Sequence, residues 1–221
     1  FTTSKDSGCI YFSVGFTNLA TNATIYNWSF GDGGSSQSKN TGHTYTYTNN
    51  TLGLDSFLVQ LVSSNTHGCS DTAKKELYVF PQVIAGFTCD TVGCSPFKNV
   101  FVNTTQSANT YTWNFGDGSA TSTATNPTHV YTNTTTAAIT YTVQLSAKSN
   151  FGCTSFATQT VTVYPKPAAS FSLNVNTGCS VFTPTITNNS TGATAGSSWN
   201  FGDGNTSLLT TPVHSFTNTA L

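Results

Sequence analysis

The chain has 221 residues, only 7% of them charged, and its seven lysines and eight acidic residues leave a formal net charge of −1. It contains no arginine, so it presents no basic surface to a phosphate backbone, and nucleic acid is excluded as a partner. No apolar run reaches the roughly 18 residues of a membrane span, and no basic segment followed by an apolar one marks a signal peptide. Thr, Val, Tyr and Phe are abundant while Glu occurs once, which predicts a soluble all-β protein without long helices.

One sequence pattern recurs three times along the chain. The motif Trp-x-Phe-Gly-Asp-Gly starts at Trp28, Trp113 and Trp199, at intervals of 85 and 86 residues. Gly-Cys pairs and histidines follow nearly the same interval, at Cys9, Cys94 and Cys179 and at His43, His129 and His214. A fixed period of this kind is the signature of a tandem array. We expect repeat 1 over residues 1–80, repeat 2 over 81–165, and a partial repeat 3 over 166–221 that lacks its last strands.

Each repeat has the length of one small β-sandwich of about seven strands. In chain order we expect a first strand opened by Phe1, Phe87 or Phe171, a turn at the Gly-Cys pair, and a second strand with one apolar face. The Trp-x-Phe strand then runs into the Gly-Asp-Gly turn. Further strands are expected at 57–61 and 141–145, and residues 161–163 close repeat 2. Apolar residues alternate with Thr, Ser or Gln in these segments, which indicates sheets with one packed and one wet face.

The boundaries between repeats are short and contain proline, at residues 80–84 and 164–167. Proline fixes φ and biases the preceding residue toward extended geometry, so we expect neighbouring repeats to form a stiff, elongated array. The incomplete repeat 3 would leave an unpaired sheet edge. We therefore expect the array to continue in a longer repeat protein, with strands donated by a neighbouring molecule as the alternative.

The fullest form of the pattern lies in repeat 2, at residues 113–118, 127–131 and 141–145. There the sequence resembles the polycystic kidney disease (PKD) domain family. With its Gly-Cys pairs and its Thr and Asn content, the chain also resembles the PKD arrays of secreted cell-surface proteins of Bacteroidota. The resemblance implies immunoglobulin-like sandwiches that serve as extracellular spacers, adhesin stalks or accessory modules beside catalytic domains. Repeat 1 departs from the pattern at Ser29, inside the motif, and at Gly42, where repeat 2 has Pro127.

The repeated motif residues are interpreted as structural. One tryptophan per repeat at the same strand position indicates core packing and not a sugar-stacking platform: Trp28, Trp113 and Trp199. The motif aspartates lie between two glycines, which predicts tight turns in which the carboxylate accepts backbone N–H groups: Asp32, Asp117 and Asp203. Some PKD domains bind Ca²⁺, but such a site needs six to eight oxygens and acids are sparse here. We expect no cofactor, with calcium as the remaining alternative.

The chain is expected to have no catalytic site and not to be an enzyme. The repeat-equivalent histidines are interpreted as hydrogen-bonded scaffold residues. No spacing of His, Cys and Glu is typical of a zinc site, and no Gly-x-Ser-x-Gly segment indicates a hydrolase.

Six cysteines in a β-array indicate disulfides and an oxidising compartment. In an immunoglobulin-like sandwich Cys9 and Cys69 lie at opposite ends, about 20 Å apart, beyond the roughly 7 Å that disulfide Cα atoms allow. We therefore expect an interdomain bridge Cys9–Cys153, with Cys69, Cys94 and Cys179 bonded to other repeats. The alternative is an intradomain pairing of Cys9 with Cys69 and of Cys94 with Cys153. Cys89 is expected to pair with Cys94 or to remain a thiol.

The function expected from these observations is a non-enzymatic extracellular stalk or surface filament whose partners are further repeats or identical chains. Asp-Thr-apolar segments resemble the O-glycosylation signal of Bacteroidota, which makes Thr72 and Thr91 candidate glycan sites. The alternatives are a carbohydrate- or protein-binding module at the cell surface and an accessory region of a secreted hydrolase.

Overall fold

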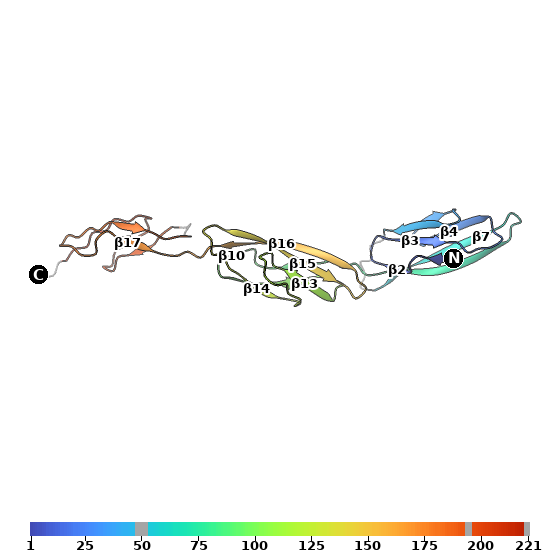
Figure 1. Cartoon of the computed structure of the whole chain (residues 1–221), viewed down its shortest axis with the longest axis horizontal. Helices are drawn as coiled ribbons and strands as arrows, with labels where there is room; N and C mark the ends of the chain where they lie inside the picture. Colours follow the sequence, from blue (N-terminus) through green and yellow to red (C-terminus); the bar gives the residue numbers. More distant parts are fainter. Residues whose placement is uncertain (47–52, 193–195, 219–221) are drawn as a thin grey trace. The chain divides into compact units, whose positions relative to one another are not determined.

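The computed structural model describes residues 1–46, 53–192 and 196–218, and every regular element in those ranges is a β-strand (Figure 1). This confirms the all-β expectation. Repeat 1 contains β1 (Thr2–Thr3), β2 (Ser7–Gly8), β3 (Phe12–Thr17), β4 (Ile25–Ser29), β5 (Ser35–Ser36), β6 (Thr41–Tyr45), β7 (Asp55–Ser64) and β8 (Ser70–Val79). Repeat 2 contains β9 (Phe87–Thr88), β10 (Val92–Cys94), β11 (Phe97–Val100), β12 (Val102–Asn103), β13 (Thr110–Asn114), β14 (Thr128–Tyr131), β15 (Ile139–Lys148) and β16 (Thr154–Tyr164). Repeat 3 contains β17 (Phe171–Leu173), β18 (Ile186–Asn188), β19 (Trp199–Asn200) and β20 (Thr206–Ser207).

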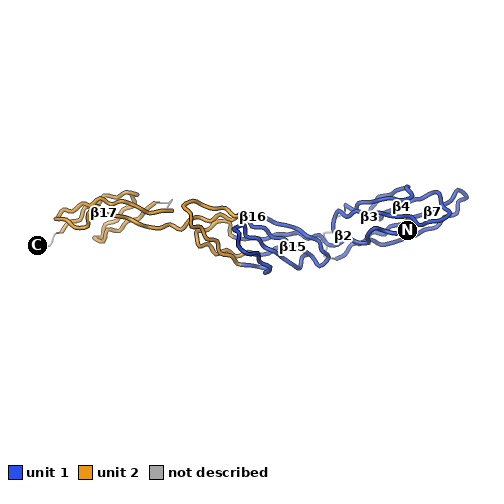
Figure 2. The backbone as a smooth tube through the Cα atoms, viewed as in Figure 1, with its two compact units in different colours: residues 1–89, 101–127, 143–159 blue, residues 90–100, 128–142, 160–221 orange. Residues whose placement is uncertain are grey.

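The chain divides into two compact units (Figure 2). Unit 1 consists of Phe1–Cys89, Phe101–Pro127 and Val143–Gln159, and unit 2 of Asp90–Val100, Thr128–Thr142 and Thr160–Leu221. The division cuts through strands β15 and β16. The segment that leads from repeat 1 into repeat 2 therefore lies inside unit 1, together with the parts of repeat 2 that surround it.

In unit 1, repeat 1 forms two sheets, with strand orders β1-β3-β6 and β2-β8-β7-β4-β5. The long strands β7 and β8 form a ten-residue antiparallel hairpin. Along β3 every second side chain is buried, because alternate residues of a strand point to opposite faces: Phe12, Val14 and Phe16 point inward. The alternation expected from the sequence thus places one face of this sheet on the core.

The core of repeat 1 is aromatic. The ring of Trp28 contacts Phe1 edge-on, with centroids 5.1 Å apart and an interplanar angle of 74°, and Phe16 lies 5.5 Å away. The equivalent rings of repeat 2 repeat this arrangement, since Phe87 meets Trp113 at 5.1 Å and 74°. Both Trp side chains are almost fully buried. The two repeats therefore build their cores in the same way, as the period of the sequence indicated.

The remaining strands of repeat 2 and those of repeat 3 form smaller ladders. β13 pairs antiparallel with β15 in unit 1, and β9 pairs with β12 there. In unit 2, β11 pairs with β14, β17 with β18, and β19 with β20. The sheet that contains β15 has the order β10-β16-β15-β13. Trp199 of repeat 3 contacts Phe171 edge-on at 5.5 Å, but it is only half-buried.

The expected turn at the Gly-Cys pair is wrong in repeats 1 and 2. Gly8 ends the short strand β2, and Cys94 ends β10; each strand runs parallel to the last strand of its own repeat. Glycine is needed because an aromatic ring packs directly over the strand. A Cβ at Gly8 would lie 2.5 Å from the Phe12 ring, and a Cβ at Gly93 would lie 2.1 Å from the equivalent ring of Phe97. The reason for the Gly is thus a tertiary contact and not a turn conformation.

Candidate functional site

The parallel strand β2 determines where Cys9 lies. Ser7 and Gly8 pair with Tyr78 and Val79 at the end of β8, and the Phe80 N–H donates to the Gly8 carbonyl (2.9 Å). Cys9 therefore sits beside the point where the chain leaves repeat 1. A cysteine at that point is within reach of the repeat that follows.

Cys9 forms a disulfide with Cys153, with Cα atoms 5.6 Å apart and 144 positions between them in sequence. Cys153 lies directly before β16, the last strand of repeat 2, and both cysteines belong to unit 1. The bond therefore links repeat 1 to repeat 2. The alternative pairing of Cys9 with Cys69 is not the one that the structure contains.

An apolar cluster surrounds this disulfide. Val83 and Cys153 are 5% exposed, Ala147 is fully buried, and Tyr111 packs against them from β13. Phe80 adds a stacked contact with Phe151, with ring centroids 4.5 Å apart and an interplanar angle of 11°. The segment between the repeats therefore has a small core of its own, which sequence reasoning missed.

The backbone of residues 84–86 is also tied to repeat 2. Ile84 and Gln106 exchange two backbone hydrogen bonds of 3.2 and 3.0 Å. The Gly86 N–H donates to Thr105 Oγ1 (3.2 Å), and the Ala85 N–H donates to Ser155 Oγ (3.3 Å). The linker is thus held by hydrogen bonds, by apolar contacts and by a covalent bond, and proline stiffness is only one part of its rigidity.

The other cysteines occupy different environments. Cys69, Cys94 and Cys179 carry free, exposed thiols, so Cys94 is bonded to neither Cys89 nor Cys153. Cys89 is half-buried, and its thiol donates to Gln159 Oε1 (3.2 Å). The bonds expected from Cys69, Cys94 and Cys179 to other repeats stay predictions.

The tryptophans of the motif occupy one position in all three repeats. Each indole N–H donates to a backbone carbonyl ten or eleven residues further on, at 2.8–2.9 Å: Trp28 to Ser38, Trp113 to Ala124, and Trp199 to Leu209. This contact fixes the ring against the segment that follows the Gly-Asp-Gly turn. The arrangement supports the interpretation of these residues as structural.

Each motif aspartate accepts a hydrogen bond from a backbone N–H two residues further on: Asp32 from Gly34, Asp117 from Ser119, and Asp203 from Asn205. This is the turn contact that the sequence predicted. The sequence reasoning did not pair the aspartates with the histidines. Asp32 Oδ2 lies 2.6 Å from His43 Nε2, and Asp203 Oδ2 lies 2.8 Å from His214 Nε2. The eleven-residue spacing from Asp to His, which is the same in repeats 1 and 3, was the available signal.

The Asp–His pair joins the turn to strand β6. Partial burial raises the pKa of the Asp32 carboxyl, but hydrogen bonds from His43 and from the Gly34 N–H outweigh this and hold that pKa below its usual value. The His43 ring is stacked on Phe30 at 4.2 Å and meets Tyr45 edge-on. An imidazole packed on two sides in this way acts as part of the scaffold.

A family model described as "PKD domain" matches residues 2–80 and 81–164. The chain belongs to the PKD domain family. The family part of the resemblance drawn from the sequence is thereby confirmed, and the chain contains PKD domains in tandem. PKD domains are typically extracellular modules without catalytic activity.

Solved structures include similar PKD domains. The PKD1 domain of Vibrio anguillarum Epp is 27% identical over 37% of this chain and 93% of its own, with a TM-score of 0.31. The PKD1 domain of the Vibrio cholerae metalloprotease PrtV is 29% identical over 37% of this chain and 96% of its own, also with a TM-score of 0.31. The fibronectin(III)-like modules of Clostridium thermocellum CbhA match 75% of this chain and 93% of their own at 8% identity, with a TM-score of 0.35. No curated protein sequence matches the chain.

The remaining predicted sites of these PKD repeats lie on the surface. Thr72 is exposed on β8, and Thr91 is exposed just before β10. Within the described ranges no three His, Cys, Asp or Glu side chains come together as a metal site, and there is no helix long and apolar enough to cross a membrane. Among the described residues that were singled out from the sequence, Cys9 and Cys153 are the pair that the structure brings together between repeats.

Proposed function

We propose that this tandem PKD segment is an extracellular mechanical spacer, part of a stalk or surface filament. The observation that carries the proposal is the Cys9–Cys153 disulfide, which lies within the apolar cluster of Val83, Ala147 and Tyr111. A flexible tether between domains needs none of these contacts, whereas a spacer that must hold its direction needs all of them. Family membership supports an extracellular location. The disulfide supports it too, because disulfides persist in oxidising compartments.

The disulfide also determines how pulling force passes through the chain. A load applied between the two ends follows the covalent path through Cys9 and Cys153, which are 144 positions apart, and bypasses the loop that they close. The core residues of repeat 1, Trp28 among them, lie inside that loop. Repeat 1 is therefore protected from extension even if its sheets open. This is the behaviour required of a stalk under shear.

Rigidity between repeats 1 and 2 is the testable core of the proposal. Backbone ¹⁵N relaxation should give one rotational correlation time for both repeats in the oxidised chain. The matched control is the double variant Cys9→Ser/Cys153→Ser, which leaves no unpaired thiol at the junction and should show faster, independent tumbling. Different correlation times for the two repeats of the oxidised wild-type chain would contradict the proposal.

The resemblance to secreted surface arrays of Bacteroidota extends the proposal. It adds O-glycans at Thr72 and Thr91, and further repeats or identical chains as partners. Intact mass above the sequence mass, localised to either threonine in protein from the native host, tests the glycan assignment.

Exposed aromatic side chains favour one second candidate, a surface that binds polysaccharide or another protein. Tyr11 and Phe156 of unit 1 are 65% and 62% exposed. Aromatic rings of this kind supply large, rigid contact area. Retention of the chain on an insoluble polysaccharide, lost in Tyr11→Ala or Phe156→Ala, would support this candidate.

A further inference from the structure

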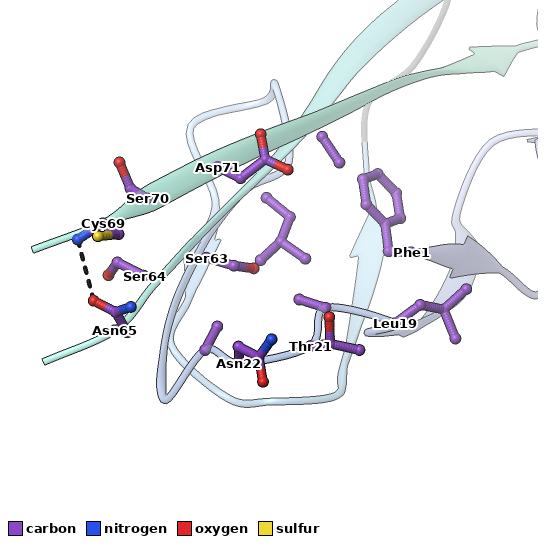
Figure 3. Close-up of a pocket in the computed structure, with 14 residues that line it drawn as sticks. Phe1, Leu19, Thr21, Asn22, Ser63, Ser64, Asn65, Cys69, Ser70 and Asp71 are labelled. Atoms are coloured by element: carbon purple, nitrogen blue, oxygen red, sulfur yellow. Dashed lines mark hydrogen bonds between the residues drawn. The ribbon is translucent and has the colours of Figure 1, made fainter. Parts of the chain in front are cut away.

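A pocket of about 500 Å³ lies at one end of repeat 1, inside unit 1 (Figure 3). The β7–β8 hairpin lines one side with Cys69 and Asp71, and the loop after β3 lines the other with Leu19 and Thr21. Phe1 lies at its edge. We call this surface the Cys69 socket. The thiol of Cys69 is free and exposed.

Repeat 2 has the equivalent surface, and there the linker covers it. By the period of the sequence, Leu19 and Thr21 of the socket correspond to Thr104 and Gln106. The Thr104 N–H donates to the Gly86 carbonyl (2.9 Å), and Gln106 exchanges two backbone hydrogen bonds with Ile84. The socket therefore presents backbone positions that, in repeat 2, pair with an incoming strand-like segment.

The hairpin side of the socket follows the same correspondence. Ser63 and Cys69 correspond to Ala147 and Cys153, which pack against Val83 of the linker. Cys153 is 5% exposed because the linker and the Gly-Cys strand of repeat 1 cover it, whereas Cys69 is exposed. The two sites thus share their framework and differ in what covers them.

We propose that the Cys69 socket binds another repeat of this kind, joined in tandem ahead of Phe1, through the Gly-Cys strand and outgoing linker of that repeat. Cys69 then forms a disulfide with the cysteine of the Gly-Cys pair, as Cys153 does with Cys9. The proposal rests on the spacer function, because it extends the same junction to a second interface.

The occupant follows from the geometry of the existing junction. Gly86 precedes Phe87 directly, and Phe87 corresponds to Phe1, which lies at the edge of the socket. A linker that runs into Phe1 as residues 80–86 run into Phe87 would thus fill the pocket along its length. The socket is in this sense the repeat 1 equivalent of the interface that the chain already forms between repeats 1 and 2.

The bond formation balances as an ordinary thiol–disulfide exchange. The thiols of Cys69 and of the incoming cysteine lose two protons and two electrons to a small-molecule disulfide. With glutathione disulfide as the oxidant, the products are one protein disulfide and two glutathione thiols. The reaction proceeds through a mixed disulfide, so the attacking thiol must be accessible, as that of Cys69 is.

The test is an extended chain in which a second copy of residues 1–86 is fused directly before Phe1, so that its Gly86 joins Phe1 as Gly86 joins Phe87. The added copy carries Cys69→Ser and Lys39→Arg. The first change leaves one Cys69 in the protein, and the second alters the mass of the tryptic peptide 6–39 without losing the cleavage site; Lys39 is exposed. After oxidation with glutathione disulfide, the unreduced protein is mapped by mass spectrometry.

We expect the mass-shifted Cys9 peptide to be joined to Cys69 and the unshifted Cys9 peptide to Cys153. Cys69 should react with iodoacetamide in the original chain and be protected in the extended one. Val83→Asp in the added copy should lower the yield of the Cys69 cross-link, because it replaces the side chain that packs against the cysteine in the existing junction with a carboxylate, and the socket already contains the carboxylate of Asp71. The matched control carries Cys69→Ser in the original repeat 1 and should keep only the Cys9–Cys153 bond.

The socket proposal is overturned if Cys69 of the extended chain still reacts with iodoacetamide, or if it is joined to the unshifted Cys9. A failure of the socket can be told apart from a failure of the spacer function within the same sample. The Cys9–Cys153 peptide, with the relaxation data on repeats 1 and 2, reports on the junction that is already closed.

Discussion

Reduction of the Cys9–Cys153 disulfide should release a defined length of chain under force. In the oxidised protein, a load applied to the two ends stretches only the residues before Cys9 and after Cys153, because the bond bridges everything between them. Reduction opens the bridge and exposes the intervening residues of repeats 1 and 2 to the load. The extension at complete unfolding must therefore increase.

The size of the increase follows from the 144-position separation of the two cysteines. An extended chain spans at most about 3.3–3.6 Å per residue, so the released length is about 500 Å. The folded distance that must be subtracted is the 5.6 Å between the two Cα atoms, which is negligible. A gain of this size is easily separated from the unfolding of a single repeat of about 85 residues, about 290 Å by the same rule.

Single-molecule force spectroscopy, with reference domains fused at both ends, measures this length directly. Wild-type protein is compared with and without reductant, and Cys9→Ser/Cys153→Ser serves as the control that should show the long extension under both conditions. An unchanged total extension on reduction of the wild-type chain would refute the reasoning. A gain near 200 Å would instead indicate that Cys9 is bonded within repeat 1, to Cys69, since that loop holds about 60 residues.

Three further predictions concern repeat 1. Trp28→Ala should lower the free energy of unfolding by about 3–5 kcal/mol in urea titrations, because it empties a buried aromatic site; full stability would contradict the core assignment. Gly8→Ala should cost about 1–3 kcal/mol, because its Cβ would lie 2.5 Å from the Phe12 ring, and Gly8→Ala/Phe12→Leu should recover part of the loss if that clash is the cause. The Asp32 carboxyl has a lowered pKa in the folded state, so its contribution to stability is present above its unfolded pKa and is lost as pH falls through the folded value. The urea concentration at the unfolding midpoint should therefore decrease as the pH is lowered below about 4, and Asp32→Asn should flatten that dependence. An equal decrease of the midpoint in the variant would show that other carboxyls cause it.

Much of the fold could be predicted because the relevant signals are local. The alternation in Phe12–Thr17 specifies which side chains face inward, since successive residues of a strand point to opposite faces. Asp32 between two glycines specifies a tight turn from its immediate neighbours alone. The expected turn at Gly8 failed for the opposite reason. There the glycine serves a ring four residues away, and sequence alone does not distinguish a glycine needed for its conformation from one needed for space.

The candidate site depended more strongly on contacts between distant residues. Two pairings of Cys9 remained open from the sequence, because the choice depends on which strand lies beside the end of β8. The parallel pairing of β2 with β8 places Cys9 at the exit from repeat 1, and no local pattern encodes that register. The pairing of Asp32 with His43 was missed in the same way, although its spacing recurs in repeat 3.

By itself the sequence determined that this protein is a series of copied β-sandwiches with aromatic cores, since a period of about 85 residues and an alternating pattern can be read without coordinates. Only the tertiary structure decided how one copy holds the next. A disulfide between residues 144 positions apart requires two backbones to approach within 5.6 Å, and that approach is set by the packing of Val83 and the hydrogen bonds of residues 84–86. Those contacts join segments far apart in the chain, so their geometry exists only once the repeats have folded.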